Sequence, residues 1–438
     1  MSFPRYSEYK ESRIPWVARI PTAWKVEPLL AVAAERNQSN EGMVEDNLLS
    51  LSYGRIIPKD IESTDGLLPE SFETYQIVEP DDIVFRLTDL QNDKRSLRTA
   101  IVRERGIITS AYLAVRPSRI FPQYLHYSLR ACDVQKVFYS MGGGLRQSLK
   151  YSDIKRFPLV IPPYGEQKAI VQFLDRETAK IDALIAEQEQ LIALLKEKRQ
   201  AVISYSVTKG LNPDAPMKDS GVDWLGKVPV HWKVGKCGFY MSVLTGFAFQ
   251  SSGFTEDESA TRLLRGVNVG VGRLKWDEVV YWQRTPEDGL SDYEMKAGDI
   301  VIGMDRPLIA DGMRVAKVAE SDLPCLLLQR VASLKIGPYL NADFLMYLLS
   351  SGMFVAHFSP ETTGVSVPHI SPDQIENFIV PIPPLQEQQL IASEVLKQTT
   401  RFDSLISEAE EATALLQERR AAIISAAVTG KIDVRGIK

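Results

Sequence analysis

The sequence predicts a mixed α/β fold in which two globular α/β domains are separated by two long helices that form an antiparallel coiled coil. Three observations support this fold class. The sequence contains an internal repeat of two copies, each copy ends in a long stretch without glycine or proline, and both stretches carry a heptad-like apolar pattern. Two copies of a unit of about 200 residues are too few and too long for a solenoid. We therefore expect a tandem duplication with a pseudo-two-fold axis.

The repeat rests on four phrases that recur in the same order, about 210 to 220 residues apart. The offset grows along the chain, so the second copy carries extra residues in its first part. The matched pairs are "PWVARIPTAWKV" from Pro15 with "DWLGKVPVHWKV" from Asp223, "PDDIVF" from Pro80 with "AGDIVI" from Ala297, "IPPYGEQ" from Ile161 with "IPPLQEQ" from Ile382, and "KRQAVISYSVTKG" from Lys198 with "RRAAIISAAVTGK" from Arg419.

In each copy the residue pattern, and with it the predicted secondary structure, changes at the Pro-Pro phrase. Before the phrase, short β-rich runs alternate with turn residues and one helical stretch, which is typical of a mixed α/β domain. After it, glycine and proline are absent from Glu166 to Lys209 and from Gln386 to Thr429. The predicted divisions are a first domain over residues 1–160, a helix over 161–210, a second domain over 211–381 and a second helix over 382–438.

The two helical stretches carry apolar residues at alternating spacings of four and three, the knobs-into-holes pattern of a coiled coil. Each helix would be about 60 Å long at 1.5 Å per residue. If the ends of the second domain lie close together, the helices run antiparallel and the chain's own ends meet near the first domain. The predicted seam residues are Ile170, Leu174, Ile181, Leu184, Leu191 and Leu195 in the first copy and Ile391, Val395, Phe402, Leu405, Leu416 and Ile423 in the second.

Composition narrows the classes of function. The chain has 438 residues, is 45% hydrophobic and 24% charged, and has a formal net charge of −5, which gives no overall footprint for nucleic acid. Its three cysteines, Cys132, Cys237 and Cys325, lie far apart, and it has only four histidines. No disulfide framework or metal centre is expected. No signal peptide or membrane segment is expected either, so the predicted location is cytoplasmic.

The motifs predict no catalytic residue. Pro162, Pro163 and Tyr164 read like the catalytic loop of amino-group methyltransferases, but that chemistry needs Asn or Asp at the position of Ile161. The repeat has Leu385 in place of the tyrosine. The phrase fits a helix start better, because proline is tolerated where backbone N–H groups have no helical partner. No glycine-rich cofactor loop precedes either copy.

Nucleic-acid binding has local support. Residues 86–119 carry eight Arg and Lys against three Asp and Glu, with Gln and Asn interleaved. Such side chains contact phosphates, and Arg, Asn and Gln also read base edges in the major groove. A cluster of charge is equally typical of a solvated face, so charge alone leaves both interpretations open. The candidate DNA-binding residues are Arg86, Lys94, Arg95, Arg98, Arg146, Gln147 and Lys150 in the first domain and Arg265, Asn268, Arg273, Arg306, Arg314 and His369 in the second.

Taken together, these features resemble the specificity subunit of Type I restriction-modification systems over residues 10–432. The resemblance is carried by the two divergent domains, the long helices, and the phrases "IPPYGEQ" to "IDALI", "IPPLQEQ" to "FDSLI", "GDIVI" and "WLGKVPVHWKV". It implies two target recognition domains that each read half of a bipartite, asymmetric double-stranded DNA site, with the helices fixing the gap. It also implies two methyltransferase subunits that bring S-adenosylmethionine, and translocase-nuclease subunits that use ATP and Mg. This chain itself would be non-catalytic and hold no cofactor.

Two alternatives from other classes stay open at this stage. One is the recognition module of a fused methyltransferase-nuclease, which the missing cofactor loop and the missing Asn/Asp-Pro-Pro motif disfavour. The other is a DNA-free coiled-coil scaffold, which the basic loops with Arg, Gln and Asn disfavour.

Overall fold

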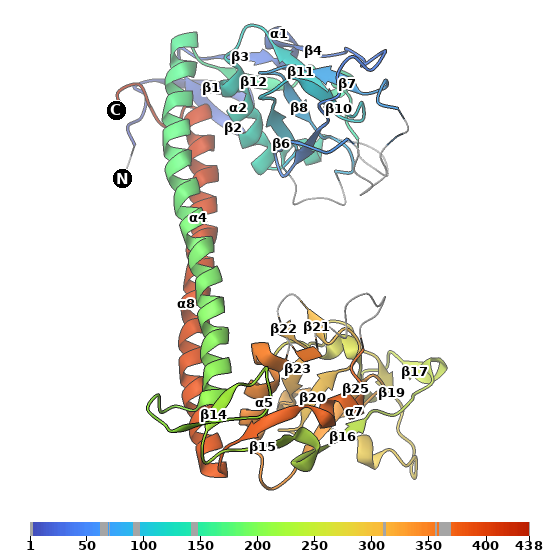
Figure 1. The fold of residues 1–438 in the computed structure, drawn as a ribbon. Helices are drawn as coiled ribbons and strands as arrows, with labels where there is room; N and C mark the ends of the chain where they lie inside the picture. The colour runs from blue at the N-terminus through green and yellow to red at the C-terminus, as the bar shows by residue number, and fades with distance from the viewer. Residues whose placement is uncertain are drawn as a thin grey trace. The chain divides into compact units, whose positions relative to one another are not determined.

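The computed structural model of the chain describes residues 3–61, 69, 71–90, 97–141, 148–309, 312–354, 357–358 and 369–437. The chain forms two compact units: unit 1 comprises Met1–Glu189 with Glu411–Lys438, and unit 2 comprises Gln190–Glu410. Each unit holds one β-rich domain with short helices and a part of each long helix (Figure 1). The predicted class, mixed α/β domains with two long antiparallel helices, is confirmed.

The long helices are α4 (Tyr164–Lys209) and α8 (Leu385–Val428), and they pack against each other in both units. In unit 2 Lys196 faces Glu410 at 3.9 Å, and the Nε of Arg199 donates to Asp403 at 2.8 Å. Moving forward along α4 thus corresponds to moving backward along α8, so the helices are antiparallel.

The pairing of the helices repeats in unit 1. There the Nε of Arg420 on α8 donates to Oδ1 of Asp182 on α4 at 2.7 Å. Asp182 and Asp403 occupy equivalent positions of the two copies, as do Arg199 and Arg420. The duplicated helices therefore carry the same Arg–Asp pair twice, once in each unit.

The apolar seam differs from the prediction by one residue over part of each helix. Leu184, Leu191 and Leu405 are 45%, 43% and 40% exposed. Ile185, Ile192 and Ile406, one position later, are more buried than these leucines. Neighbouring apolar residues offer two possible phases for the 3.5-residue repeat, and packing against the partner helix selects the second phase here. Of the other predicted residues, six are buried (Ile170, Leu174, Ile181, Ile391, Val395 and Ile423) and three are half-buried (Leu195, Phe402 and Leu416).

Unit 1 is organised around an antiparallel sheet with strand order β4-β11-β8-β9, and α2 (Pro122–Val134) buries Tyr124, Leu125 and Leu129 in the core beside it. Its β-rich texture follows from short runs of Ile, Val and Leu bounded by turn residues. The other elements are β1 (Tyr9–Ile14), β2 (Val17–Pro21), β3 (Lys25–Pro28), α1 (Leu29–Val32), β4 (Ala33–Glu35), β5 (Leu49–Ser52), β6 (Arg55–Pro58), β7 (Gln76–Val78), β8 (Ile83–Phe85), β9 (Thr99–Ile101), β10 (Gly106–Ile108), β11 (Leu113–Pro117), α3 (Tyr151–Ile154) and β12 (Pro158–Ile161).

Unit 2 repeats this plan with the antiparallel sheet β16-β25-β20-β23 and adds a second sheet, β17-β19-β18-β24. The second sheet lies largely within the stretch where this copy is longer. The elements are β13 (Met217–Asp219), β14 (Lys227–Pro229), β15 (Lys233–Lys236), β16 (Met241–Thr245), β17 (Phe254–Thr255), β18 (Thr261–Leu264), β19 (Tyr281–Trp282), β20 (Ile300–Gly303), β21 (Leu308–Ile309), β22 (Gly312–Met313), β23 (Val315–Lys317), β24 (Cys325–Leu327), β25 (Val331–Ile336), α5 (Ala342–Leu349), α7 (Pro372–Asn377) and β26 (Ile379–Ile382).

The repeated Pro-Pro phrase is a junction between strand, long helix and domain. The amide Nε2 of Gln167 donates to the carbonyl of the first proline at 2.9 Å, and its Oε1 accepts from the backbone N–H of Phe121 at 2.8 Å. Gln388 makes the same two bonds in unit 2, to the first proline at 2.8 Å and from the N–H of Asn341 at 2.8 Å. Each glutamine thus ties the start of α4 or α8 to the start of α2 or α5.

In each unit the second tryptophan of the double-tryptophan segment packs against the C-terminal end of a long helix. Trp24 and Trp232 are fully buried. A Cβ on Gly430, which follows α8, would lie 3.2 Å from Trp24, and one on Gly210, which follows α4, would lie 3.3 Å from Trp232. Both glycines have positive φ, which L side chains disfavour. Glycine is therefore required where each helix ends against its tryptophan.

The chain's two ends lie together in unit 1, as expected from the sequence (Figure 1). The backbone N–H of Asp433 donates to the carbonyl of Pro4 at 2.8 Å, and the hydroxyl of Tyr9 donates to the carbonyl of Gly430 at 3.0 Å. Within the described residues, no helix is both long enough and apolar enough to span a membrane.

Candidate nucleic-acid interface

In both units an arginine closes the loop that follows the central strand. Arg98, at the end of the loop after β8, is fully buried, and its Nη1 donates to the carbonyl of Thr88 at 3.1 Å. Arg314, at the end of the loop after β20, is half-buried, and its Nη1 donates to the carbonyl of Asp305 at 3.0 Å. The backbone carbonyls of the two arginines are also used alike, accepting from the N–H of residue 86 at 2.8 Å and of residue 303 at 2.9 Å.

Each arginine makes further bonds that hold the protein together. The Nε of Arg98 donates to the hydroxyl of Tyr139 at 3.2 Å, and the Nε of Arg314 donates to the carbonyl of Val269 at 2.9 Å. Buried charged groups are stable only when they are hydrogen-bonded in this way. Both arginines were candidate DNA contacts in the sequence, and their positions here assign them the support of the loop instead.

A second segment reaches the same loop in each unit. The N–H of Leu149 donates to the carbonyl of Leu87 at 2.9 Å, and the N–H of Ile370 donates to the carbonyl of Met304 at 2.9 Å. These contacts bring together two stretches that are about 60 residues apart in sequence. We define recognition surface 1 as residues 86–90 and 148–150, and recognition surface 2 as residues 304–309 and 369–371.

Recognition surface 1 presents two of the predicted DNA-binding residues. Arg86 lies directly after β8 with its side chain half-exposed, and Lys150 is exposed at the start of α3. Arg98 lies behind this surface, as described above. The remaining candidates of this domain, Lys94, Arg95, Arg146 and Gln147, lie outside the described residues.

Recognition surface 2 is built around the carboxylate of Asp305. The Nδ1 of His369 lies 2.7 Å from Oδ1 of Asp305, and the Nη1 of Arg330 lies 3.0 Å from its Oδ2. Arg306, the next residue, is exposed and adopts a positive φ of 44°. Arg330 was missed by the sequence analysis because it stands as a single arginine before a strand, without neighbouring basic residues.

Of the three predicted DNA-binding residues between 265 and 273, two hydrogen-bond to backbone carbonyls of their own loop and one is exposed. Asn268 is 1% exposed, and its Nδ2 donates to the carbonyls of Lys275 and Glu278 at 2.9 Å each. Arg265 donates from Nη2 to the carbonyl of Glu278 at 2.8 Å. Arg273, by contrast, is exposed. Asn268 therefore shapes the loop that also accepts the bond from Arg314, and only Arg273 is placed to reach a ligand.

The adjacent carboxylates of Asp81 and Asp82 do not form a paired acidic site. Asp82 is fully buried between Arg36 at 3.6 Å and Arg116 at 3.5 Å, and accepts from the N–H of Glu79 at 2.9 Å. Burial raises the pKa of the Asp82 carboxyl despite these partners. Asp81 has a positive φ of 72° in the preceding turn. In the described part of the chain, no group of three or more His, Cys, Asp or Glu side chains could hold a metal ion.

Comparison with known proteins finds relatives of this chain in one family. The model of the family described as "Type I restriction modification DNA specificity domain" matches residues 277–413, which include Arg306, Arg314 and the start of α8. The chain is 28% identical over 342 residues to the Type I restriction enzyme MjaVIII specificity subunit of Methanocaldococcus jannaschii, covering 76% of each chain. The chain belongs to the Type I restriction-modification specificity subunits.

Two further comparisons cover almost the whole length. A putative MjaX specificity subunit, also of Methanocaldococcus jannaschii, is 22% identical over 459 residues and covers 99% of both chains. A chain from a solved structure titled as the basis of complex assembly and conformational transition of the type I R-M system has a TM-score of 0.66 at 17% identity, covering 94% of this chain and 99% of that one. The latter likeness supports the fold. As a member of this family, the chain is the non-catalytic specificity subunit of a Type I restriction-modification complex.

Proposed function

We propose that this specificity subunit reads a bipartite, asymmetric double-stranded DNA site, with recognition surface 1 reading one half and recognition surface 2 the other. The observation that carries the proposal is that one loop framework holds different side chains in the two units. The same arginine-to-carbonyl bond and the same second-segment bond recur. Around them, Arg86 is replaced by Gly303, Thr88 by Asp305, and Lys150 by Ser371. Two different half-sites require different base-contacting side chains, and here such side chains differ on a shared loop conformation.

The chemistry of the exposed residues supports this assignment. Arg and Lys donate to guanine O6 and N7 or to phosphates, and an Asp–His pair offers both an acceptor and a donor to base edges. On this proposal Arg86, Lys150, Arg273, Arg306 and His369 contact DNA, together with the predicted Lys94, Arg95, Arg146 and Gln147. Arg98, Asn268, Arg265 and Arg314 hold the loops in place.

The helices α4 and α8 are proposed to set the gap between the two half-sites. A paired antiparallel helix is stiff along its length, and its matched Arg–Asp pairs fix the helical register in each unit. We further infer that two methyltransferase subunits dock on this chain with S-adenosylmethionine, and that translocase-nuclease subunits supply ATP- and Mg-dependent cleavage. These partners supply part of the phosphate contact, which accounts for an acidic net charge of −5 in a DNA-binding subunit. The proposed location is the cytoplasm.

Selection from random duplexes with the assembled complex tests the two surfaces separately. The double variant Arg86→Ala/Lys150→Ala is expected to relax one half of the selected motif, and Arg273→Ala/Arg306→Ala the other half. Each lost base contact costs about 1–3 kcal/mol of discrimination, which is a change of about 5- to 150-fold. The matched control Arg19→Ala/Arg119→Ala removes two exposed arginines of unit 1 outside the surface and is expected to leave both halves unchanged. Unchanged affinity and motif in both surface variants would rule out the assignment.

A further inference from the structure

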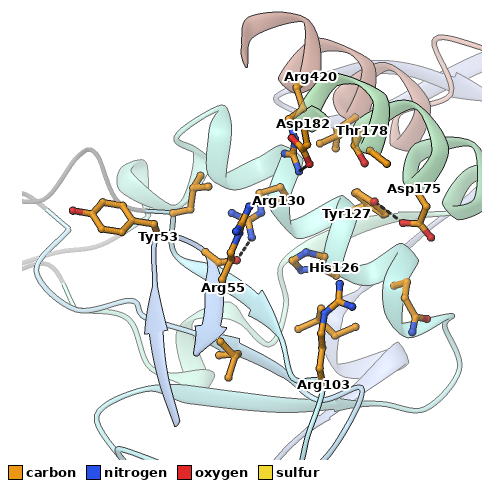
Figure 2. A pocket seen from close by; sticks show the side chains of 17 residues that line it. Tyr53, Arg55, Arg103, His126, Tyr127, Arg130, Asp175, Thr178, Asp182 and Arg420 are labelled. Carbon is orange, nitrogen blue, oxygen red and sulfur yellow. Dashed lines mark hydrogen bonds and ion pairs between the residues drawn. The ribbon is translucent and has the colours of Figure 1, made fainter. Parts of the chain in front are cut away.

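A pocket of about 620 Å³ opens in unit 1 beside α4 and α8, and no residue of recognition surface 1 is among those that line it. Its walls come from the β5–β6 hairpin, the end of β9, one face of α2, and the two long helices (Figure 2). Its volume falls within the range of small-ligand pockets, about 300–1,000 Å³. Apolar side chains such as Ile56 and Ile101 line it between the charged groups.

Four arginines converge on this pocket with few compensating charges. Arg420 is paired with Asp182 at 2.7 Å, and Arg130 donates to the carbonyls of Gly54 at 2.5 Å and Thr99 at 2.8 Å. Arg55 and Arg103 are exposed, and no hydrogen bond or ion pair of their guanidinium groups is found among the described residues.

The carboxylates of the pocket are already engaged. Asp182 is bound to Arg420, and Asp175 accepts from the hydroxyl of Tyr127 at 2.7 Å. Four arginines therefore face two carboxylates, each of which already has a partner. The pocket keeps an excess of positive charge that an entering anion would balance.

His126, which also lines the pocket, has an unpartnered ring nitrogen and lies close to several arginines. Figure 2 shows its ring between the side chains of Arg103 and Arg130. Its Nδ1 is buried without a hydrogen-bond partner within the described part of the chain. Burial, together with Arg130, Arg103 and Arg420, lowers the pKa of His126 to about 3, so the ring is neutral and one nitrogen can donate. Burial, with Arg420 and Arg55, likewise lowers the pKa of Arg130 to about 10.

We propose that this pocket is a phosphate-binding site, in which Arg55, Arg103 and Arg420 hold one phosphate group over His126. Planar guanidinium groups bind phosphate through paired, charge-assisted hydrogen bonds, and a cluster of arginines selects phosphate over a neutral ligand. The phosphate belongs either to a DNA backbone or to a free phosphorylated solute such as a nucleotide. The exposed ring of Tyr53 at the rim could stack on a base in both cases.

The site is a property of unit 1 and not of the duplicated frame. Because Phe121 and Asn341 bind equivalent glutamines, α2 and α5 can be aligned residue by residue. The positions of His126 and Arg130 are then taken by Met346 and Ser350 in unit 2. The inference therefore goes beyond half-site reading, which needs a surface in each unit.

Titration of the full chain with inorganic phosphate, followed by calorimetry, tests the proposal. We expect one saturable site, and the double variant Arg55→Ala/Arg103→Ala should weaken it at least about tenfold because each charge-assisted bond lost costs that order of affinity. Arg55→Lys/Arg103→Lys should retain part of the affinity. The control Arg19→Ala/Arg119→Ala should match the parent chain. All four substituted positions are exposed, so folding is expected to be kept, and thermal melting checks this.

Two further arms identify the source of the phosphate. If it is a DNA backbone phosphate, duplex DNA competes with inorganic phosphate, and Arg55→Ala/Arg103→Ala makes the slope of log K against log salt for DNA binding less negative by about 0.9. If it is a free solute, adenosine monophosphate binds more tightly than phosphate and duplex DNA does not compete. Absence of saturable phosphate binding, or equal affinity in the parent and Arg55→Ala/Arg103→Ala chains, overturns the proposal. This titration needs no target sequence, so its failure leaves half-site reading untouched, and the converse holds.

Discussion

Replacing Arg98 by alanine is expected to destabilise the β8–β9 region of unit 1 by about 2–4 kcal/mol, because a fully buried guanidinium bonded to two backbone carbonyls and a tyrosine is lost. The carbonyls of Thr88 and Asp89 lose that partner. Lysine at the same position should not rescue the loss, since a single ammonium cannot reproduce the bonds of the planar fork.

The measurement for Arg98→Ala is amide hydrogen exchange of the full chain, followed at the N–H groups of Arg86 and Leu149, which bond across the loop. Arg86→Ala is the matched control, because its half-exposed side chain lies on the same loop, and its exchange should stay near that of the parent. If Arg98→Ala left exchange unchanged but abolished DNA binding by the assembled complex, Arg98 would be a DNA contact and not a support.

Ile406→Asp is expected to destabilise the helix pair by about 3 kcal/mol or more, whereas Leu405→Asp should cost less than about 1 kcal/mol. Ile406 is 9% exposed and Leu405 is 40% exposed, so only the first substitution places a carboxylate in the seam between α4 and α8. Urea unfolding followed by the circular dichroism of the helices compares the two variants directly.

The pair Leu405 and Ile406 also controls for helix propensity, since both are replaced by the same residue one position apart in the same helix. Equal losses of stability in the two variants, or a larger loss for Leu405→Asp, would show that the seam follows the leucines, as the sequence pattern alone suggested.

The repeat allowed much of the fold to be predicted. Two copies of the Pro-Pro phrase before glycine-free stretches indicated two long helices, and the connection through the second domain indicated that these run antiparallel if the two ends of that domain lie close together. The phase of the seam could not be predicted, because Leu405 and Ile406 are both apolar and differ only in what they meet on the facing helix. Helix pairing is a tertiary property, and where two neighbouring residues are both apolar the sequence pattern does not show which of them faces the partner helix.

The candidate site shows the same limit more sharply. The sequence placed Arg98 and Arg314 among the DNA-binding residues because both stand in basic, polar loops. The direction of a long side chain depends on whether backbone carbonyls are left open beneath it, and that depends on how the loop after β8 or β20 curls back. The pocket around His126 could not be seen at all, since it gathers residues from β6, β9, α2, α4 and α8.

The repetition of the Pro-Pro-x-x-Glu-Gln phrase has a physical explanation in Gln167 and Gln388. Each side chain uses both its donor and its acceptor to join a proline carbonyl to the first N–H of a domain helix. A carboxylate or a lysine could make only one of these bonds. The residue before it also has a partner in each unit. Glu166 accepts from the hydroxyl of Tyr6, whose ring packs on Trp24, and Oε2 of Glu387 lies 2.7 Å from Nε2 of His231, which precedes Trp232. The phrase therefore anchors each β-rich domain to the start of its long helix.

Sequencing of methylated bases in the genome of a host that expresses this chain with its methyltransferase partner tests the central claim most directly. The account predicts a split, asymmetric motif: two different short half-sites separated by a fixed run of unspecified bases. The Arg86→Ala/Lys150→Ala chain should weaken the base preference in one half of the motif only. A single contiguous motif, or a methylation pattern that is the same with and without this chain, would contradict it.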